Sequence, residues 1–106
     1  MVNKILTLAG FVEHKTFEET RFLQPPKQTY AVYNDSFTRR GADDLNLIRE
    51  HDCTIELYAY KKDVESEKRI EKVLDDLAIE FDKQERYWIQ SEQIYQTIYE
   101  FNFIEK

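Results

Sequence analysis

The chain has 106 residues, of which 42% are hydrophobic and 34% are charged, with only two glycines and two prolines. This size and composition fit a single α+β domain over residues 1–106 and argue against a loop-rich or low-complexity chain. The formal net charge of −6 argues against a protein that holds nucleic acid through clustered lysine and arginine. No apolar run is long enough for a membrane span, so we expect a cytosolic protein.

The chain begins with a short segment of helical period. Apolar residues within 2–11 lie along one helical stripe, and Gly10 favours a helix end. Residues 11–23 show no clean period, so we expect an extended piece that lies on the core. Pro25 and Pro26 then break regular structure.

Two strands joined by a charged loop are expected next. Residues 28–37, QTYAVYNDSF, alternate as a strand does, and residues 45–60 predict a longer strand with one core face. Between them TRRGADD, at 38–44, predicts a loop, because Gly41 tolerates turn conformations and its charged neighbours favour water.

The clearest helical pattern follows Asp63, a residue type that caps helix N-termini. Residues 64–79 carry apolar side chains three and four positions apart, so we expect an amphipathic helix. Its apolar positions, continued to the start of the next strand, are Ile70, Val73, Leu74, Leu77, Ala78 and Phe81. The charged positions expected in solvent are Glu67, Lys68, Glu71, Lys72, Asp75 and Asp76.

The last part of the chain predicts an antiparallel hairpin of residues 81–89 and 94–103, with QSEQ as the turn. In its first strand, alternation places Phe81, Tyr87 and Ile89 on one face, with Trp88 on the other.

The final strand, within SEQIYQTIYEFNF, is apolar on both faces. Its core face holds Tyr95, Thr97, Tyr99, Phe101 and Phe103. Its second face includes Ile94 and Ile98, which need cover from the same chain or from another molecule.

The expected order is helix, strand, strand, helix, strand, strand. This order predicts an α+β fold with a single mixed or antiparallel sheet of about four strands and two helices packed on it. The second face of the sheet would be covered within the chain if helix 2–10 lay on one face and helix 64–79 on the other. Otherwise a second molecule would have to cover it.

No catalytic or metal-binding motif is present. His14 and His51 are too far apart in sequence for a paired metal site, and we expect no cofactor and no metal. Cys53 lies on a core face, which favours a buried thiol over a nucleophile. We expect a non-enzymatic protein. One alternative is a small enzyme whose dispersed site places His51 or Cys53 beside an acid.

The chain has more aromatic residues than two covering helices obviously need. Tyrosine and tryptophan anchor many protein interfaces, and the TRRGADD loop carries both signs of charge. The candidate interface residues are Arg39, Arg40, Asp43, Asp44, Tyr58, Tyr60, Trp88, Ile94 and Ile98.

The succession of GADD, TIELYAYKKD, ESEKRIEKVLDDL and ERYWIQSEQIYQTIYEF resembles a family of small tail-completion proteins. These are encoded by siphophages and prophages of Gram-positive bacteria, close to the tail-terminator group. The resemblance covers about residues 28–103. LQPPKQTYAVYNDSF also matches the family's order of a proline-containing segment and an aromatic strand, whereas EHKTFEETRF matches it loosely.

The resemblance implies a non-enzymatic virion assembly protein that forms a homo-oligomeric ring, commonly of six subunits, at the head-proximal end of the tail tube. Its partners would be the tail-tube protein and the head-connector proteins, with no membrane and no specific nucleic acid. It would occupy the host cytoplasm during assembly and then the head–tail junction of the virion. The alternatives are a head-side connector adaptor or stopper, or a small cytosolic protein-binding module.

Overall fold

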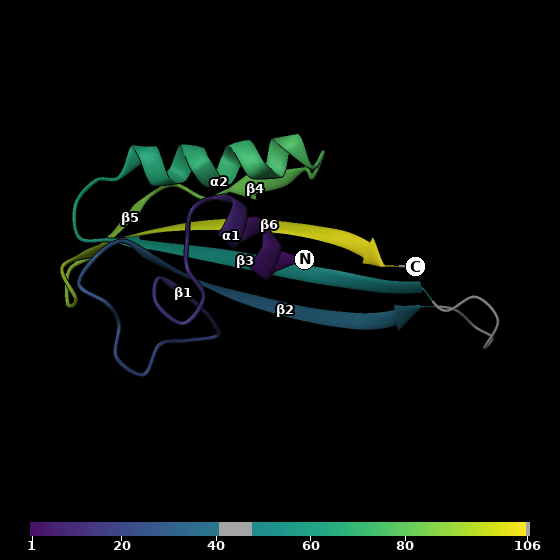
Figure 1. The fold of residues 1–106 in the computed structure, drawn as a ribbon, viewed down its shortest axis with the longest axis horizontal. Helices are drawn as coiled ribbons and strands as arrows, with labels where there is room; N and C mark the ends of the chain where they lie inside the picture. The colour runs from purple at the N-terminus through teal and green to yellow at the C-terminus, as the bar shows by residue number, and fades with distance from the viewer. Residues whose placement is uncertain (41–47, 106) are drawn as a thin grey trace.

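The structure is a computed structural model that describes residues 1–40 and 48–105, with the backbone alone described at 37–40, 48–49 and 105. The α+β class and the two helices are confirmed, but the sheet has six strands rather than about four (Figure 1). The elements are α1 (Val2–Leu8), β1 (Phe17–Glu19), β2 (Tyr30–Arg40), β3 (Ile48–Ala59), α2 (Val64–Asp76), β4 (Phe81–Lys83), β5 (Tyr87–Ile89) and β6 (Ile94–Glu105). No helix among the described residues is long and apolar enough to cross a membrane.

The sheet is mixed, with strand order β1-β2-β3-β6-β4, and β5 pairs with the same side of β6 as β4. β1 runs parallel to β2, and every other pair is antiparallel. β1 lies in the segment expected to be extended on the core. It becomes a strand because Ala31 N–H donates to the Thr16 carbonyl and Thr20 N–H donates to the Tyr33 carbonyl.

β4 and β5 together form the single strand expected at 81–89, divided by a bulge. Phe81 lies opposite Phe101 and Tyr87 lies opposite Gln96, so this segment has one residue more than β6 between the two pairs. The extra residue reverses the alternation. Phe81 therefore lies on the core face, whereas Tyr87 and Ile89 lie on the second face, and the expectation that all three share a face is wrong.

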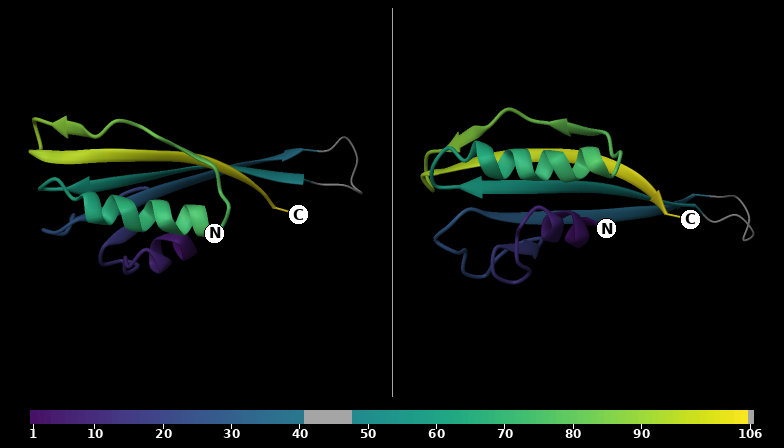
Figure 2. Two further views of the ribbon diagram at one scale, coloured as in Figure 1. Left: turned by 90° about the horizontal axis from the view of Figure 1, so that it is seen from above. Right: turned by 45° about the horizontal axis from the view of Figure 1, so that its top comes forward.

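Both helices pack on the same face of the sheet (Figure 2). The alternative in which the two helices cover opposite faces is therefore excluded, because each helix has one apolar stripe and the sheet offers one continuous apolar face. The buried cluster that they form consists of Val2, Ile5, Leu6, Ala9, Phe11, Phe17, Ala31, Cys53, Ile55, Leu57, Ile70, Val73, Leu74, Tyr99 and Phe101. The expected core faces of β3 and β6 are thus confirmed.

α2 ends earlier than the apolar pattern indicates. Its last residue is Asp76, and Ala78 has a φ of 57°, in the left-handed region that ends a helix. Leu77 and Ala78 are exposed, and Phe81 reaches the core from β4. The apolar stripe of the helix itself therefore stops at Leu74.

The N-terminus of α2 is capped as expected. Asp63 Oδ1 accepts a hydrogen bond of 3.0 Å from the Ser66 N–H, and Asp63 Oδ2 accepts one of 2.7 Å from the Thr29 hydroxyl. The second bond ties the start of α2 to the segment before β2. Burial would raise the pKa of Asp63, but the hydrogen bonds that it accepts from the Ser66 N–H and from the Thr29 and Ser66 hydroxyls outweigh burial and lower the pKa.

Candidate interaction surface

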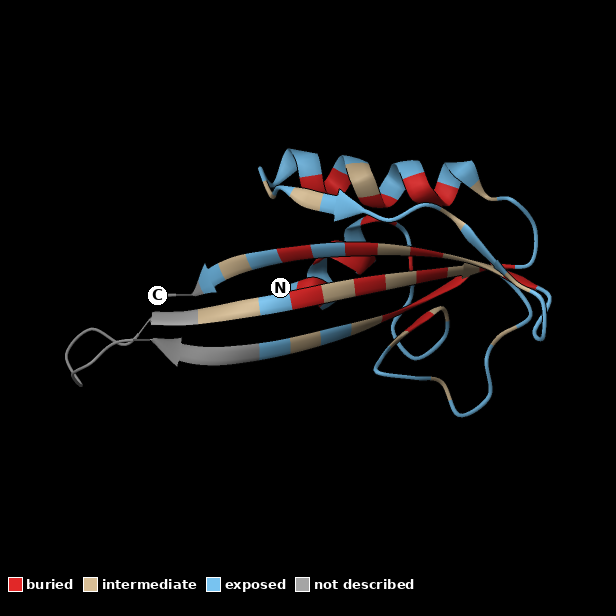
Figure 3. Cartoon of the chain, turned by 180° about the vertical axis from the view of Figure 1, so that it is seen from behind, coloured by how far each residue is buried: buried red, intermediate tan, exposed pale blue. Residues whose placement is uncertain are grey.

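The second face of the sheet, which carries no helix among the described residues, is polar and acidic. Along β3 and β6, buried positions alternate with positions that are half-buried or exposed (Figure 3), as expected when one face of a sheet is covered more fully than the other. Four rows of this face have all their side chains described, namely Tyr30, Tyr58, Gln96 and Tyr87; Val32, Glu56 and Ile98; Asn34, Thr54, Glu100 and Asp82; and Ser36, Asp52 and Asn102. These four rows contain four carboxylates and no lysine or arginine.

A ladder of hydrogen bonds fixes the aromatic end of this face. The Tyr58 hydroxyl donates to Glu56 Oε1 at 2.6 Å and accepts from Gln96 Nε2 at 2.9 Å. Its ring stacks on Tyr30 with 5.1 Å between centroids. Burial and the Glu56 carboxylate raise the pKa of Tyr58, so its hydroxyl remains a donor. Tyr58, a candidate interface residue, is therefore held by contacts within its own chain.

Two other predicted aromatic residues are partly exposed at the same end of the sheet. The Tyr60 hydroxyl donates to the Pro26 carbonyl at 2.9 Å, which holds the segment before β2 in place. Trp88 donates from Nε1 to Gln90 Oε1 at 3.0 Å, and its ring lies 4.7 Å from that of Tyr95. Because Trp88 lies opposite Tyr95, it belongs to the face that bears the helices.

The isoleucines of β6 differ in exposure. Ile94 is only 3% exposed, so its own chain covers it, whereas Ile98 is half-buried on the second face. The most exposed aromatic residue of this face is Tyr87, at 64%. Sequence alternation missed Tyr87, because the bulge that turns it onto this face leaves no periodic signal.

The four charged candidates lie at or beyond the end of β2. Arg39 and Arg40 belong to β2, where the backbone alone is described. Asp43 and Asp44 lie outside the described residues. Among the candidates with described side chains, the sheet brings Tyr58, Ile94 and Ile98 onto one face.

A histidine and a cysteine meet an aspartate on the face that bears the helices. His51 Nδ1 lies 2.7 Å from Asp35 Oδ1, and Cys53 hydrogen-bonds to the same carboxylate. The His51 ring stacks on Phe103 with 4.4 Å between centroids. The enzyme alternative requires such a cluster. A nucleophilic cysteine needs a lowered thiol pKa, however, whereas burial and the Asp35 charge raise the pKa of Cys53 to about 12.

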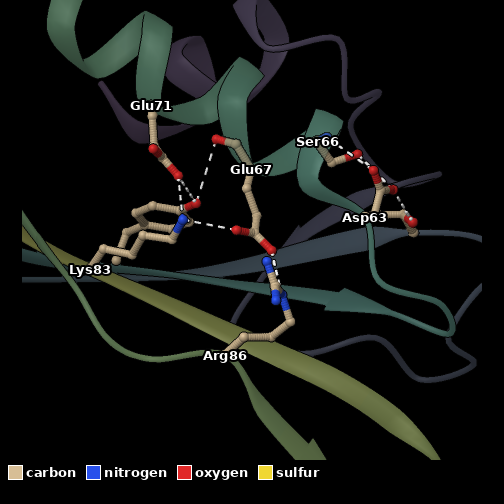
Figure 4. A network of polar contacts seen from close by, with 8 residues as sticks. Asp63, Ser66, Glu67, Glu71, Lys83 and Arg86 are labelled. Atoms are coloured by element: carbon tan, nitrogen blue, oxygen red, sulfur yellow. Dashed lines mark hydrogen bonds and ion pairs between the residues drawn. The ribbon is translucent and has the colours of Figure 1, made fainter.

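A second polar cluster ties α2 to the bulge between β4 and β5 (Figure 4). Glu67, expected in solvent, is only 2% exposed, and that expectation is wrong. Its carboxylate accepts from Lys83 Nζ and from Arg86 Nε, both at 2.8 Å. Lys83 also pairs with Glu71 at 2.8 Å, and the Tyr99 hydroxyl donates to Glu71 Oε2 at 2.7 Å. The end of β4 and the bulge that follows it supply Lys83 and Arg86, the two cations that neutralise the buried Glu67 carboxylate.

The protonation of Glu67 follows from these contacts. Burial alone would raise the pKa of the carboxyl, but the hydrogen bonds and positive charges of Arg86 and Lys83 outweigh it and lower the pKa. The carboxylate is therefore charged at neutral pH, and this cluster stabilises the fold rather than presenting a chemical group to solvent.

Among the described residues, no group of three or more His, Cys, Asp or Glu side chains is arranged to hold a metal ion. No model of a known protein family matches the chain, and a search of curated proteins gave no match. The family resemblance therefore stays a prediction from the sequence, and the function is inferred from geometry and charge.

The Cys53 thiol is expected to be inert in the native chain. At about pH 8, a thiol-specific reagent should modify native Cys53 roughly 100-fold more slowly than the urea-unfolded chain, because the native thiol is buried and protonated. His51→Ala should leave the native rate within about threefold. Fast native modification that His51→Ala abolishes would instead indicate a Cys–His nucleophile.

Glu67→Gln should lower the free energy of unfolding by about 1–3 kcal/mol at neutral pH, because Lys83 and Arg86 would lose their buried anion. Asp76→Asn, which breaks the exposed pair with Lys72, is the control and should change it by less than about 0.5 kcal/mol. Urea unfolding measures both variants.

The pH dependence of the free energy of unfolding tests the role of Glu67 a second time, by comparison of Glu67→Gln with the wild type. The stabilisation from the lowered Glu67 pKa is present above the ordinary value of 4.5 and is lost as the pH falls through the folded value. Glu67→Gln should therefore lose less stability than the wild type on acidification. Equal losses would contradict the assigned role of Glu67.

Proposed function

We propose that the chain is a ring-forming subunit of a siphophage or prophage tail terminator, which ends growth of the tail tube and joins it to the head connector. The observation that carries this proposal is the acidic second face of the sheet. The sequence resemblance supplies the class of assembly, and the geometry supplies a surface suited to it.

The second face has the charge that a DNA channel needs. A surface that DNA must pass without adhering has to avoid the lysine and arginine clusters that hold phosphates. The four rows of this face whose side chains are all described contain no lysine or arginine, and Asp52, Asp82 and Glu100 are exposed on it. Such a face repels a polyanion and suits the lumen of a ring.

The arrangement of the helices also supports an assembly role. With α1 and α2 on one face, the subunit has a helical side and a sheet side, which is the asymmetry needed for an inside and an outside in a ring. The two buried polar clusters stabilise the fold, and the raised pKa of Cys53 opposes thiol chemistry. The proposed partners are the tail-tube protein and the head-connector proteins. The proposed locations are the host cytoplasm and then the head–tail junction.

Light scattering with and without the tail-tube protein of the same phage or prophage tests this function. The wild-type chain should form a species several times the mass of the 12.9 kDa subunit, alone or on tube ends. Added to polymerising tube protein, it should shorten the tubes seen by electron microscopy. Bovine serum albumin at equal mass is the control.

The same binding measurements, repeated with connector proteins, distinguish the terminator from the head-side adaptor or stopper and from the protein-binding module. Binding to connector proteins without any effect on tubes would indicate a head-side adaptor or stopper and would overturn the terminator function. A chain that ignores tube and connector proteins would indicate a protein-binding module outside the virion.

Charge reversal tests which face lines the ring. Rings of the triple variant Asp52→Lys, Asp82→Lys and Glu100→Lys should bind duplex DNA and protect it from nuclease, with an affinity that falls steeply with salt. Wild-type rings should leave the DNA unbound.

The matched control reverses three exposed acids of α2, in the variant Glu65→Lys, Asp75→Lys and Asp76→Lys, which has the same net charge. Any DNA that its rings bind should stay sensitive to nuclease, because α2 lies on the opposite side of the sheet. Equal sensitivity of the two complexes would place the second face outside the lumen.

A further inference from the structure

We propose that copies of the chain join head to tail through two bare strand edges, the outer edge of β2 at residues 34–40 and the outer edge of β6 at residues 102–105. This inference rests on the proposed ring and names the surfaces that build it. The occupant of each edge is a second copy of this chain. The contact is made by backbone hydrogen bonds that extend one sheet into the next.

The first bare edge belongs to β2. β1 pairs with residues 31–33 alone, and the last hydrogen bond at this edge runs from the Thr20 N–H to the Tyr33 carbonyl. Alternate residues of a strand point their backbone groups to the same edge, so Asp35, Phe37 and Arg39 turn N–H and C=O outward. Within residues 1–40 and 48–105, no strand pairs with this part of β2.

The second bare edge belongs to β6. β4 pairs with β6 only as far as Phe101, and the Gln84 N–H donates to the outward-pointing Ile98 carbonyl at 2.9 Å. By the same alternation, Asn102 and Ile104 turn their backbone groups outward. No strand of the described chain pairs with them on that side. Ile104 is also 61% exposed, an uncovered apolar side chain beside the bare edge.

The two edges lie at the same end of the sheet, on its opposite sides. Ser36, Asp52 and Asn102 are level across β2, β3 and β6, and the helices end before this part of the sheet (Figure 1). An unpaired strand edge is a template for another strand, and proteins usually shield it. Here the same end of the sheet presents one such edge to each side.

Strand direction favours a head-to-tail contact between the β6 edge of one copy and the β2 edge of the next. β2 and β6 each run antiparallel to β3, so they run parallel to each other, and a copy placed beside β6 would continue the sheet with a parallel pair. Each copy then uses different edges for its two neighbours, and such contacts form a ring when the rotation between successive copies closes.

Proline substitutions on each edge test this contact. The N–H groups of Phe37 and Ile104 point outward, so Phe37→Pro and Ile104→Pro remove no hydrogen bond within the sheet but block a neighbouring strand. Phe37→Ala and Ile104→Ala keep the N–H and are the matched controls. Circular dichroism confirms that each variant folds, and Ile104→Lys, which adds an edge charge, replaces a proline variant that does not.

Light scattering in the presence of tail-tube protein should show rings for the wild type and both alanine variants. Each proline variant alone should lose at least about tenfold in ring mass fraction, in keeping with the loss of the one contact that closes the ring. An equal mixture of the two proline variants should form pairs of twice the 12.9 kDa subunit, because each retains the edge that the other lacks.

Other outcomes overturn the proposal in distinguishable ways. Rings from Ile104→Pro would show that β6 is not a contact edge and would leave the terminator function standing. A dimer from Ile104→Pro alone would indicate a symmetric β2–β2 contact instead of a head-to-tail one. Wild-type rings that ignore tubes would overturn the proposed function while the proline variants still test the edges, and a wild type that stays monomeric in all conditions would overturn both.

Discussion

The single apolar face of the sheet is the constraint on which the rest of the structure depends. Ala31, Ile55, Leu57 and Tyr99 lie on it, and burying such side chains stabilises a fold by about 25 cal/mol per Å² of apolar area. A helix with one apolar stripe gains most on that face, since carboxylates and amides interrupt the apolar side chains of the second face. Both helices therefore share one side, and the polar side remains for contacts outside the monomer.

The bulge between β4 and β5 is the second organising feature. One extra residue reverses the alternation, so Lys83 lies on the same face as Tyr99 and Tyr87 lies on the opposite one. Lys83 and Arg86 can then neutralise Glu67, whose burial would otherwise carry a large desolvation penalty. The same irregularity thus permits a buried carboxylate and exposes a tyrosine.

Local patterns were enough to predict the features of this architecture that depend on a single element. The core faces of β3 and β6, the Asp63 cap and the burial of Cys53 follow from side-chain spacing along one element, and each is confirmed. The parallel pairing of β1, the bulge and the burial of Glu67 were missed. They arise from contacts between segments distant in sequence, and a helical period places Glu67 on the charged face whether or not a cation reaches it.

On the candidate surface too, residues in regular strands were predicted, whereas those that depend on the bulge were missed. Alternation correctly placed Ile98 on the second face, because β6 is regular there. The placement of Trp88 on the opposite face from Ile89 also holds, since the two are neighbours within β5. Tyr87 could not be recognised, because its exposure depends on a bulge that no local spacing predicts.

The two proposals are linked by sheet geometry. A head-to-tail edge contact extends the sheet without turning it over, so the second faces of successive copies stay on the same side of the assembly. The carboxylates Asp52, Asp82 and Glu100 would then form a continuous acidic surface around the ring. In the proposed ring, one short contact at this end of the sheet, repeated in every subunit, would keep all the acidic faces on the same side of the assembly.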